Sequence, residues 1–459
     1  MKKPAHCLKS SVVVGLILVL GLYFQAEAHA GGELPLLGEN SAINIEQEKR
    51  IGHTFYRRLL AQGVVETNPI LHSYLNELGA RLLSNLDLRL RDYQFFIVKD
   101  LSVNAFAVPG GYIGVNVGLI LRAQNQDQLA SVLAHEISHV RLMHGLQLME
   151  KAGGVGNTSI ITMLAGILLS GISPELGSAV LFGGVASGEQ AMINYTREFE
   201  YEADRLGIEL LQGGNFDPQG MVDFFRMMER ISGNSEFQSI EYLRTHPVND
   251  NRISEVENRI RSMTVARSGP DYFQMFRDYL FYLSLDRMDY TGSEFRKALA
   301  KSKMGEFEQA NLSLEKLYQQ DSENVWYGYV YAENLENMNQ LDEARQVYSK
   351  LLEIFPDEFA LSLRFIRLLK SAGDFDSALV IARRLEKRFP GEKRVYKELS
   401  EIYNKLQQPI HRMMAEAEYH QLSGNYQLAI NLYDTVIGSP QTDDATESRA
   451  MAKRVEISR

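Results

Sequence analysis

Two histidines one helical turn apart, with a glutamate between them, are the residues in this sequence that point most directly to chemistry. His135, Glu136 and His139 form the motif H-E-x-x-H within residues 128–144, whose apolar spacing is that of a helix. Side chains four residues apart lie on the same helical face, so both imidazoles can reach one metal ion. Glu136 lies one step round the helix, within reach of a water on that metal. We interpret the motif as two zinc ligands and a general base.

A catalytic zinc site needs a third protein ligand and leaves a fourth position open for water. One completion of the motif would place a histidine ten residues after His135 and a glycine seven residues after it. Those positions hold Gly145 and Leu142, so this completion fails. His144 lies five residues beyond His139 and points away from the ligand face of the predicted helix. We expect His144 to support the site from outside or to pack in the core.

A later acidic segment offers the missing ligand. Glu200 and Asp204 are four residues apart on a second predicted helix and share one face. We predict that Glu200 binds the zinc. Asp204 would then accept a hydrogen bond from the distal nitrogen of a zinc-bound histidine, which orients the ring. Glu198 and Glu202 are competing ligands, but each lies on a different face from Asp204.

The elements that must position these residues are mostly helical. Residues 93–99 form a predicted strand, and residues 103–119 contain two β-prone runs around a Pro-Gly-Gly turn, which predicts a hairpin. A sheet edge beside the H-E-x-x-H helix could take an extended peptide by strand addition. Asn104, Ala105 and Phe106 are the candidate residues of that edge. The same pattern also fits an ordinary hairpin in the core.

Length and composition indicate a globular protein of several domains. The chain has 459 residues, of which 45% are hydrophobic and 23% are charged, and two or three domains are expected. Its net charge of −10 argues against nucleic acid or an anionic membrane surface as the main partner. Cys7 is the only cysteine and lies in the leader described next. A mature chain would therefore hold zinc by nitrogen and oxygen alone.

Residues 1–30 have the features of a secretory signal. Three lysines precede a short apolar run, and small residues then allow cleavage after Ala28 or Ala30. The alternative is an uncleaved anchor, although the apolar run is short for a membrane span. We predict a signal peptide at residues 1–28 and export of the chain. The leader carries a charge of +2, so a mature chain cut after Ala28 would carry −12.

A second apolar region lies between residues 151 and 195. It is rich in glycine, is interrupted by Pro174-Glu175, and contains no run long enough to cross a bilayer. We predict a hydrophobic flap or re-entrant helix beside the active site. The alternative is peripheral membrane contact through residues 159–187.

The sequence repeats itself from about residue 293 onward. Segments beginning at Gly305, Asn339, Gly373 and Gly424 share a pattern that ends in an alanine five residues later. The first three alanines are 34 residues apart, and the last step is 51, as if one extra helix were inserted around Pro409. This period resembles tetratricopeptide repeats, whose stacked helix pairs present a concave face to peptides or proteins. The array could instead be purely structural.

Four motifs in this order resemble the M48 family of zinc metallopeptidases. They are Asn104-Ala-Phe-Ala with the Pro-Gly-Gly turn, H-E-x-x-H, Glu200-x-x-Ala-Asp204, and His246-Pro247 followed by Arg252-Ile253. The resemblance implies one zinc ion per chain, Glu200 as third ligand, and a mainly α, gluzincin-like domain with a small β-sheet. We place this domain at residues 45–265 and a tetratricopeptide-repeat α-solenoid at residues 270–459, with Ser268-Gly269-Pro270 as the linker.

The resemblance also implies that His246 is an active-site residue, and its role stays open. It could donate a hydrogen bond to the oxyanion that forms during hydrolysis. It could instead bind zinc as a fourth ligand in a closed, self-inhibited state, which the resemblance suggests for this subgroup. A third alternative is a capping histidine before Pro247.

A leader, an M48 domain and a repeat array together are similar to periplasmic members of the family. This implies a periplasmic zinc endopeptidase, with chaperone-like activity, in the assembly and quality control of outer-membrane β-barrel proteins. Its expected partners are unfolded or stalled β-barrel proteins and, through the repeats, the barrel-assembly machinery. The rival prediction is a non-proteolytic periplasmic chaperone or scaffold whose metal site is silent or structural.

Overall fold

The structure is a computed structural model that describes residues 45–84, 86, 93–145, 147, 189–232, 240–263, 271–285 and 291–458. The predicted signal peptide, the apolar segment at 159–187 and the Ser268-Gly269-Pro270 linker lie outside these residues. The chain divides into residues 1–44 and a compact unit, Ile45–Arg459, which contains every element described below. Within the described residues, no helix combines the length and the apolar character needed to span a bilayer.

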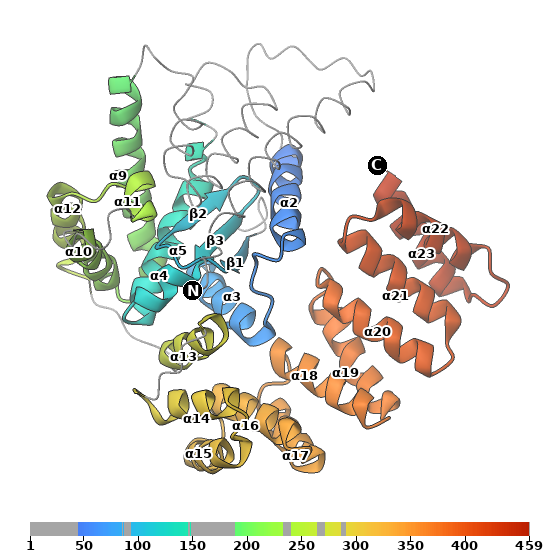
Figure 1. The fold of residues 1–459 in the computed structure, drawn as a ribbon. Coiled ribbons are helices and arrows are strands. Elements are labelled where there is room, and N and C mark those ends of the chain that lie inside the picture. The colour runs from blue at the N-terminus through green and yellow to red at the C-terminus, as the bar shows by residue number, and fades with distance from the viewer. Residues whose placement is uncertain are drawn as a thin grey trace, which may run out of the picture. The chain divides into compact units, whose positions relative to one another are not determined.

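A small mixed sheet and four helices begin the compact unit (Figure 1). The strands have the order β1-β3-β2, with β1 parallel to β3 and β2 antiparallel to it. This arrangement confirms the predicted hairpin, whose turn has two glycines at a φ of 87°, and leaves β2 at the edge of the sheet. The elements are α2 (Ile45–Ala61), α3 (Pro69–Leu83), β1 (Gln94–Val98), β2 (Ala105–Val108), β3 (Tyr112–Asn116), α4 (Val117–Arg122) and α5 (Gln126–Arg141).

The helix that carries the H-E-x-x-H motif, α5, has a defined start and is almost wholly buried. The Asn125 side chain caps it by accepting a hydrogen bond from the Gln128 backbone N–H at 2.9 Å. Its buried residues include Leu129, Leu133 and Ile137, each with 0% of its surface exposed. A capped helix sealed in the core holds its side chains in fixed rotamers, which is what a metal site requires.

Four further helices complete the N-terminal part of this unit: α9 (Glu189–Gly213), α10 (Gln219–Ser232), α11 (Glu241–Thr245) and α12 (Asp250–Ile260). α9 packs along α5, and Gly207 faces α5 where the two helices meet. A Cβ at Gly207 would lie 3.6 Å from the Ala134 carbonyl carbon and from the His135 backbone nitrogen. The two helices that carry the predicted ligands therefore lie close together at Gly207, with room there for little more than a methyl group.

The C-terminal part is a run of helix pairs, which confirms the predicted repeat array. The turns between paired helices contain a left-handed residue at Gly305, Asn339, Gly373 and Gln407, which are 34 residues apart. Gly424 adds a further left-handed turn only 17 residues later, so one additional helix is inserted, as expected from the spacing. The helices are α13 (Phe273–Ser284), α14 (Glu294–Lys303), α15 (Phe307–Gln320), α16 (Val325–Asn337), α17 (Leu341–Ile354), α18 (Phe359–Ser371), α19 (Phe375–Arg388), α20 (Lys393–Lys405), α21 (Pro409–Leu422), α22 (Tyr426–Ile437) and α23 (Asp444–Ser458).

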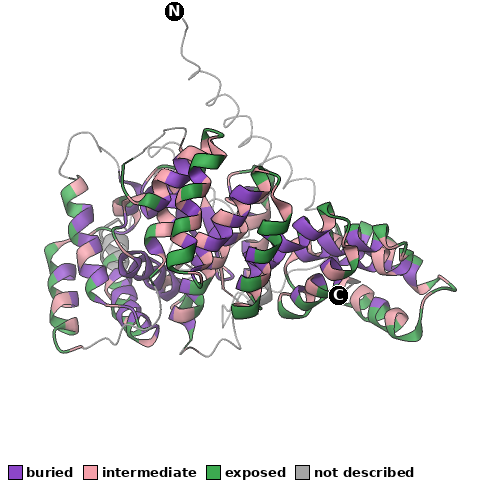
Figure 2. Ribbon diagram, turned by 90° about the horizontal axis from the view of Figure 1, so that it is seen from below, coloured by how far each residue is buried: buried purple, intermediate pink, exposed green. Residues whose placement is uncertain are grey.

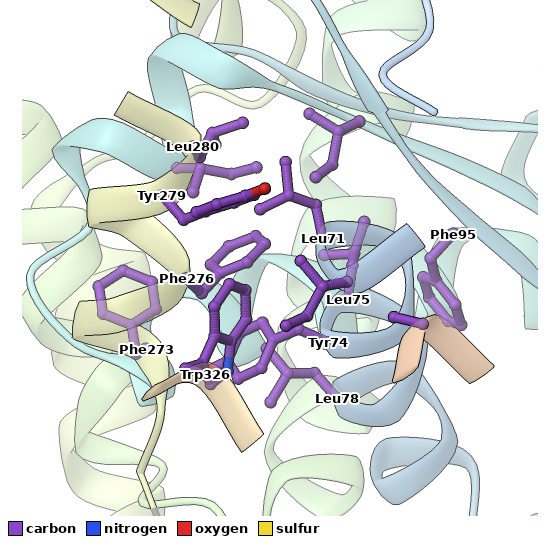
Figure 3. Close-up of a cluster of buried hydrophobic side chains, with 14 of the residues drawn as sticks. Leu71, Tyr74, Leu75, Leu78, Phe95, Phe273, Phe276, Tyr279, Leu280 and Trp326 are labelled. Carbon is purple, nitrogen blue, oxygen red and sulfur yellow. The ribbon is translucent and has the colours of Figure 1, made fainter. Parts of the chain in front are cut away.

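One hydrophobic core runs from the helices of the N-terminal part into the first repeats. Tyr74 of α3 stacks on Phe276 of α13 at 4.4 Å between ring centroids, and both rings meet Trp326 of α16 edge-on (Figure 3). Buried and exposed positions alternate along the helices around this core, as expected for amphipathic segments (Figure 2). The predicted boundary between two domains at residues 265–270 stays a prediction, because that segment lies outside the described residues.

Candidate metal centre

Four side chains from three segments converge on one point. His135 and His139 of α5, Glu200 of α9 and His246 just after α11 each direct one ligand atom inward, and these atoms all lie within 4.8 Å of one another. The two α5 histidines approach through their Nε2 atoms at 3.0 Å. Glu200 Oε1 lies 3.3 Å from His139 Nε2, and Glu200 Oε2 lies 3.3 Å from His135 Nε2.

The donor set fits zinc. Ligand atoms held about 2.0–2.1 Å from a tetrahedral zinc ion are separated from each other by about 3.3 Å. The separations here are 3.0–3.3 Å, including 3.3 Å from His135 Nε2 to His246 Nδ1. Lone pairs of ring nitrogens repel at such distances unless a proton or a cation lies between them. Three imidazoles and one carboxylate are also the nitrogen and oxygen ligands that zinc accepts.

His246 lies inside this cluster, not beside it. Its Nδ1 atom is 3.1 Å from Glu200 Oε1, and its Nε2 atom is 3.4 Å from Glu136 Oε1. The Tyr242 ring lies 4.8 Å from the His246 ring at an angle of 32° and supports it from α11. This position is the one that a fourth ligand would occupy, and the role of His246 stays a prediction.

Asp204 lies behind His135 in the manner expected. Its Oδ1 atom accepts a hydrogen bond from His135 Nδ1 at 3.0 Å. Because a carboxylate only accepts, a neutral His135 ring keeps its proton on Nδ1 and directs the lone pair of Nε2 toward the cluster. The two competing carboxylates point elsewhere, since Glu198 is exposed and Glu202 bonds to His144.

Arg252, at the start of α12, is a functional residue to which sequence reasoning assigned no role. It is only 1% exposed, and its guanidinium donates to both oxygens of Asp204 at 2.8 Å. The same group lies 2.8 Å from Glu200 Oε2 and donates to the Pro247 carbonyl at 2.7 Å. A signal was present in the sequence, because Arg252 shares the buried stripe of α12 with Ile253 and Val256.

The charges of the metal-free site are arranged so that a cation would replace a proton. Burial disfavours the charged ring of His135, but the carboxylates of Glu200 and Asp204 outweigh burial and raise its pKa to about 10. Burial likewise opposes ionisation of Glu200, yet the facing histidines hold its pKa well below the usual range. Burial lowers the pKa of His139 to about 3, so that ring stays neutral. A metal ion that binds Nε2 of His135 would therefore displace a proton from that ring.

Glu136 is buried beside the cluster. It is 0% exposed, and His246 Nε2 lies 3.4 Å from its Oε1 atom, within ion-pair distance but without the geometry of a hydrogen bond. Burial raises its pKa, although the neighbouring rings of His246 and His135 act in the opposite direction. A buried carboxylate without a hydrogen bond is costly unless another group uses it. Its placement suits a proton acceptor for a molecule that enters the site.

Of the three proposed edge residues, Ala105 and Phe106 lie on β2 and face opposite ways, and Asn104 immediately precedes the strand. Phe106 packs edge-on against Phe55 of α2 and Phe96 of β1, so its ring belongs to the α2 face of the sheet. Ala105 is one position away on the strand and points to the opposite face, where it is 0% exposed. Asn104 is 5% exposed, and its Oδ1 atom has no partner within the described residues. Any peptide on this edge would meet backbone and not the Phe106 ring.

Comparisons with known proteins show what the chain is similar to. Residues 69–260 match the model of peptidase family M48, and residues 302–364 match a tetratricopeptide-repeat model. The chain is 31% identical over 344 residues to the beta-barrel assembly-enhancing protease of Escherichia coli strain K12, covering 70% of each chain. It is 30% identical over 424 residues to a putative beta-barrel assembly-enhancing protease of Vibrio cholerae, covering 87% of each. A solved structure of MamA from MSR-1 covers 33% of this chain and 87% of its own, at 16% identity and a TM-score of 0.27.

Proposed function

Because this chain belongs to peptidase family M48 and is a zinc metallopeptidase, we propose that His135, His139 and Glu200 bind its zinc ion and that Glu136 is its general base. The observation that carries this proposal is the convergence of the three ligand atoms at about 3 Å from one another. Three ligands from two helices leave one position for water or substrate.

The chain's own residues suggest how peptide hydrolysis proceeds. A bound zinc ion supplies Lewis-acid chemistry, which lowers the pKa of water and polarises a peptide carbonyl. Glu136 takes a proton from the attacking water and delivers it to the leaving amine. Its raised pKa supports this role, since a carboxyl group that shuttles protons near neutral pH works best above its ordinary range.

His246 is assigned to a closed state of the same site. With its Nδ1 atom 3.3 Å from His135 Nε2 and 3.1 Å from Glu200 Oε1, it occupies the position that water or substrate would need. We therefore favour the fourth-ligand role over the oxyanion role. The segment after α11 must move before a substrate reaches the zinc, and movement of His246 would also free Glu136.

The substrate class follows from the relatives. Proteins named for enhancing beta-barrel assembly match this chain over 70–87% of its length. We propose that the chain cleaves or assists unfolded or stalled outer-membrane β-barrel proteins in the periplasm. The backbone of β2 at Asn104, Ala105 and Phe106 would bind an extended segment by strand addition. The repeat array would contact the barrel-assembly machinery.

Substitution of Glu136 by glutamine tests the catalytic assignment. Glu136→Gln should bind one zinc per chain with an affinity near that of the parent, because Glu136 is not a ligand, and should lose cleavage of an unfolded protein by about 100-fold or more. Zinc content and cleavage of a casein-type substrate are the measurements. The rival scaffold function predicts that Glu136→Gln still rescues cells under outer-membrane stress as well as the parent, and full rescue would reject the peptidase role.

Removal of the His246 ring distinguishes its two roles. His246→Ala should increase cleavage of unfolded protein several-fold, because the closed state loses its fourth ligand. The oxyanion role predicts the opposite, a loss of about 100-fold or more. His420→Ala, on the distant helix α21, is the matched control and should leave cleavage unchanged. Turnover numbers for the three proteins decide between the roles.

A further inference from the structure

His144 reaches the metal site through an unusual turn. α5 ends at Arg141, and Met143 then adopts a left-handed conformation with φ at 56°, although it is not glycine. Such a conformation costs roughly 1 kcal/mol per residue and needs support from its surroundings. Met143 itself is 47% exposed, whereas His144 is only 3% exposed. The turn therefore directs the His144 side chain back toward the His139 ring of α5.

Three contacts fix the buried ring of His144. Its Nδ1 atom lies 3.0 Å from Nδ1 of His139, on the side of the His139 ring that faces away from the ligand cluster. Its Nε2 atom lies 3.2 Å from Oε2 of Glu202 on α9. Its flat face stacks on Phe199 of α9, with 4.3 Å between ring centroids and 14° between ring planes. His144 thus links the end of α5 to the helix that carries the third ligand.

The direction of these hydrogen bonds follows from elementary chemistry. The Glu202 carboxylate can only accept, so a neutral His144 ring carries its proton on Nε2 and has a lone pair on Nδ1. That lone pair accepts a hydrogen bond from Nδ1–H of His139. A neutral His139 protonated on Nδ1 has its free lone pair on Nε2, the atom that faces Glu200 and His135.

We propose that His144 is a positioning residue, which Glu202 and Phe199 hold so that His139 presents its Nε2 lone pair to the metal. In this arrangement His144 does for His139 what Asp204 does for His135. The Asp204 carboxylate orients His135 directly. The Glu202 carboxylate orients His139 through the imidazole of His144. The inference rests on the zinc ligands proposed above.

Two substitutions of His144 separate the hydrogen-bond relay from packing. His144→Phe keeps a flat ring for the stack on Phe199 and removes both nitrogens. His144→Gln removes the ring, but its amide oxygen can accept from His139 and its amide nitrogen can donate to Glu202. Zinc affinity of the full chain is measured by competition with a chromophoric chelator, and melting temperatures are measured with zinc and after chelation.

The relay predicts a specific pattern. His144→Phe should lose about 10- to 100-fold in zinc affinity, as is typical when the outer partner of a ligand histidine is removed. His144→Gln should stay within about threefold of the parent. The melting temperature of chelated His144→Phe should match that of the chelated parent. On α9, Glu202→Gln should weaken zinc binding, and the exposed Glu198→Gln is the matched control that should not.

Other outcomes would overturn the inference. Unchanged zinc affinity of His144→Phe would exclude a positioning role, and a His144→Gln chain as weak as His144→Phe would show that the ring itself matters. An equal loss of stability with and without zinc would assign His144 to packing alone. Cleavage of unfolded protein by Glu136→Gln at the rate of the parent would reject Glu136 as general base and leave this comparison intact. A parent chain that binds no zinc would reject both proposals.

Discussion

Arg252 is the residue on which the charge balance of the site depends. Two buried carboxylates, Glu200 and Asp204, share this single buried guanidinium, which also holds the carbonyl that follows His246. A buried charge that loses its partner is strongly destabilising, because its desolvation is no longer offset. Arg252 therefore holds the carboxylates of Glu200 and Asp204 and the Pro247 carbonyl at the same time.

Substitution of Arg252 by methionine should damage both stability and metal binding. Arg252→Met preserves much of the side-chain volume but leaves two buried carboxylates without their cation, so we expect a loss of about 3–5 kcal/mol in the free energy of unfolding. Zinc affinity should fall about 10- to 100-fold as Glu200 loses its orientation. Urea unfolding and chelator competition measure the two effects.

Arg259→Met is the matched control for this substitution. Arg259 lies on the same helix, α12, two turns further on, and is exposed. Removal of an exposed charge changes stability by less than about 0.5 kcal/mol in most proteins. Equal effects of Arg252→Met and Arg259→Met would contradict the role of the buried guanidinium.

At the scale of elements, the repeat array depends on a left-handed residue in each turn between paired helices. Glycine takes this conformation without strain, and Gly305 and Gly373 do so at φ of 78° and 80°. Asn339 and Gln407 fill the equivalent positions at φ of 60° and 55°. Asparagine tolerates this region better than most residues, whereas glutamine has no such preference.

Gln407 is therefore a strained position, and glycine should relieve the strain. Gln407 is exposed, so its side chain contributes little packing. Gln407→Gly should raise the free energy of unfolding by about 0.5–1 kcal/mol, measured by urea unfolding. The adjacent Gln408→Gly is the control, since Gln408 has an ordinary φ of −105°, and it should be neutral or destabilising. A loss of stability in Gln407→Gly would contradict the argument from strain.

Gln407 also explains the irregular step in the repeats. It lies 34 residues after Gly373 and continues the period of the turns. Because the residue is glutamine and not glycine or asparagine, the sequence does not reveal this turn as a member of the repeat. α21, which begins at Pro409, follows this turn and precedes the turn at Gly424. The helix therefore pairs with α20 on one side and α22 on the other (Figure 1).

At the scale of the whole molecule, the metal should couple three segments that are distant in the sequence. His135 and His246 are 111 residues apart. Without zinc, the proton on His135 takes part of the role of the cation, since its pKa is raised to about 10 in the folded chain, against 6.5 when unperturbed. Between these two pH values the folded chain binds one proton more than the unfolded chain. Metal-free stability must therefore fall as pH rises through this range.

This linkage predicts a different pH dependence for the metal-free chain and the zinc-bound chain. After chelation, the melting temperature should decrease from pH 7 to pH 9.5, because the unfolded chain has lost this proton while folded His135 still holds it. With saturating zinc the decrease should be smaller, because the cation has displaced that proton, and the gap between the two forms should widen with pH. His135→Gln should flatten the metal-free profile. A gap that narrows toward high pH would contradict the assignment of the proton to His135.

The sequence by itself determined whatever depends on local spacing. The four-residue step from His135 to His139, the Pro-Gly-Gly turn and the 34-residue period each predict the geometry of a few neighbouring residues, and the structure contains that helix, hairpin and repeat array. The same local logic placed Glu200 and Asp204 on one helical face. Their roles as ligand and supporting carboxylate stay predictions until zinc is measured.

Only the tertiary structure decided which groups meet across long separations. Helical spacing does not predict that His246 approaches His135 or that His144 contacts His139. It also does not predict that Glu200 and Asp204 share Arg252. These contacts depend on how α9, α11 and α12 pack around α5, and packing is set by the shapes of many buried side chains together. A single sequence pattern does not contain that information.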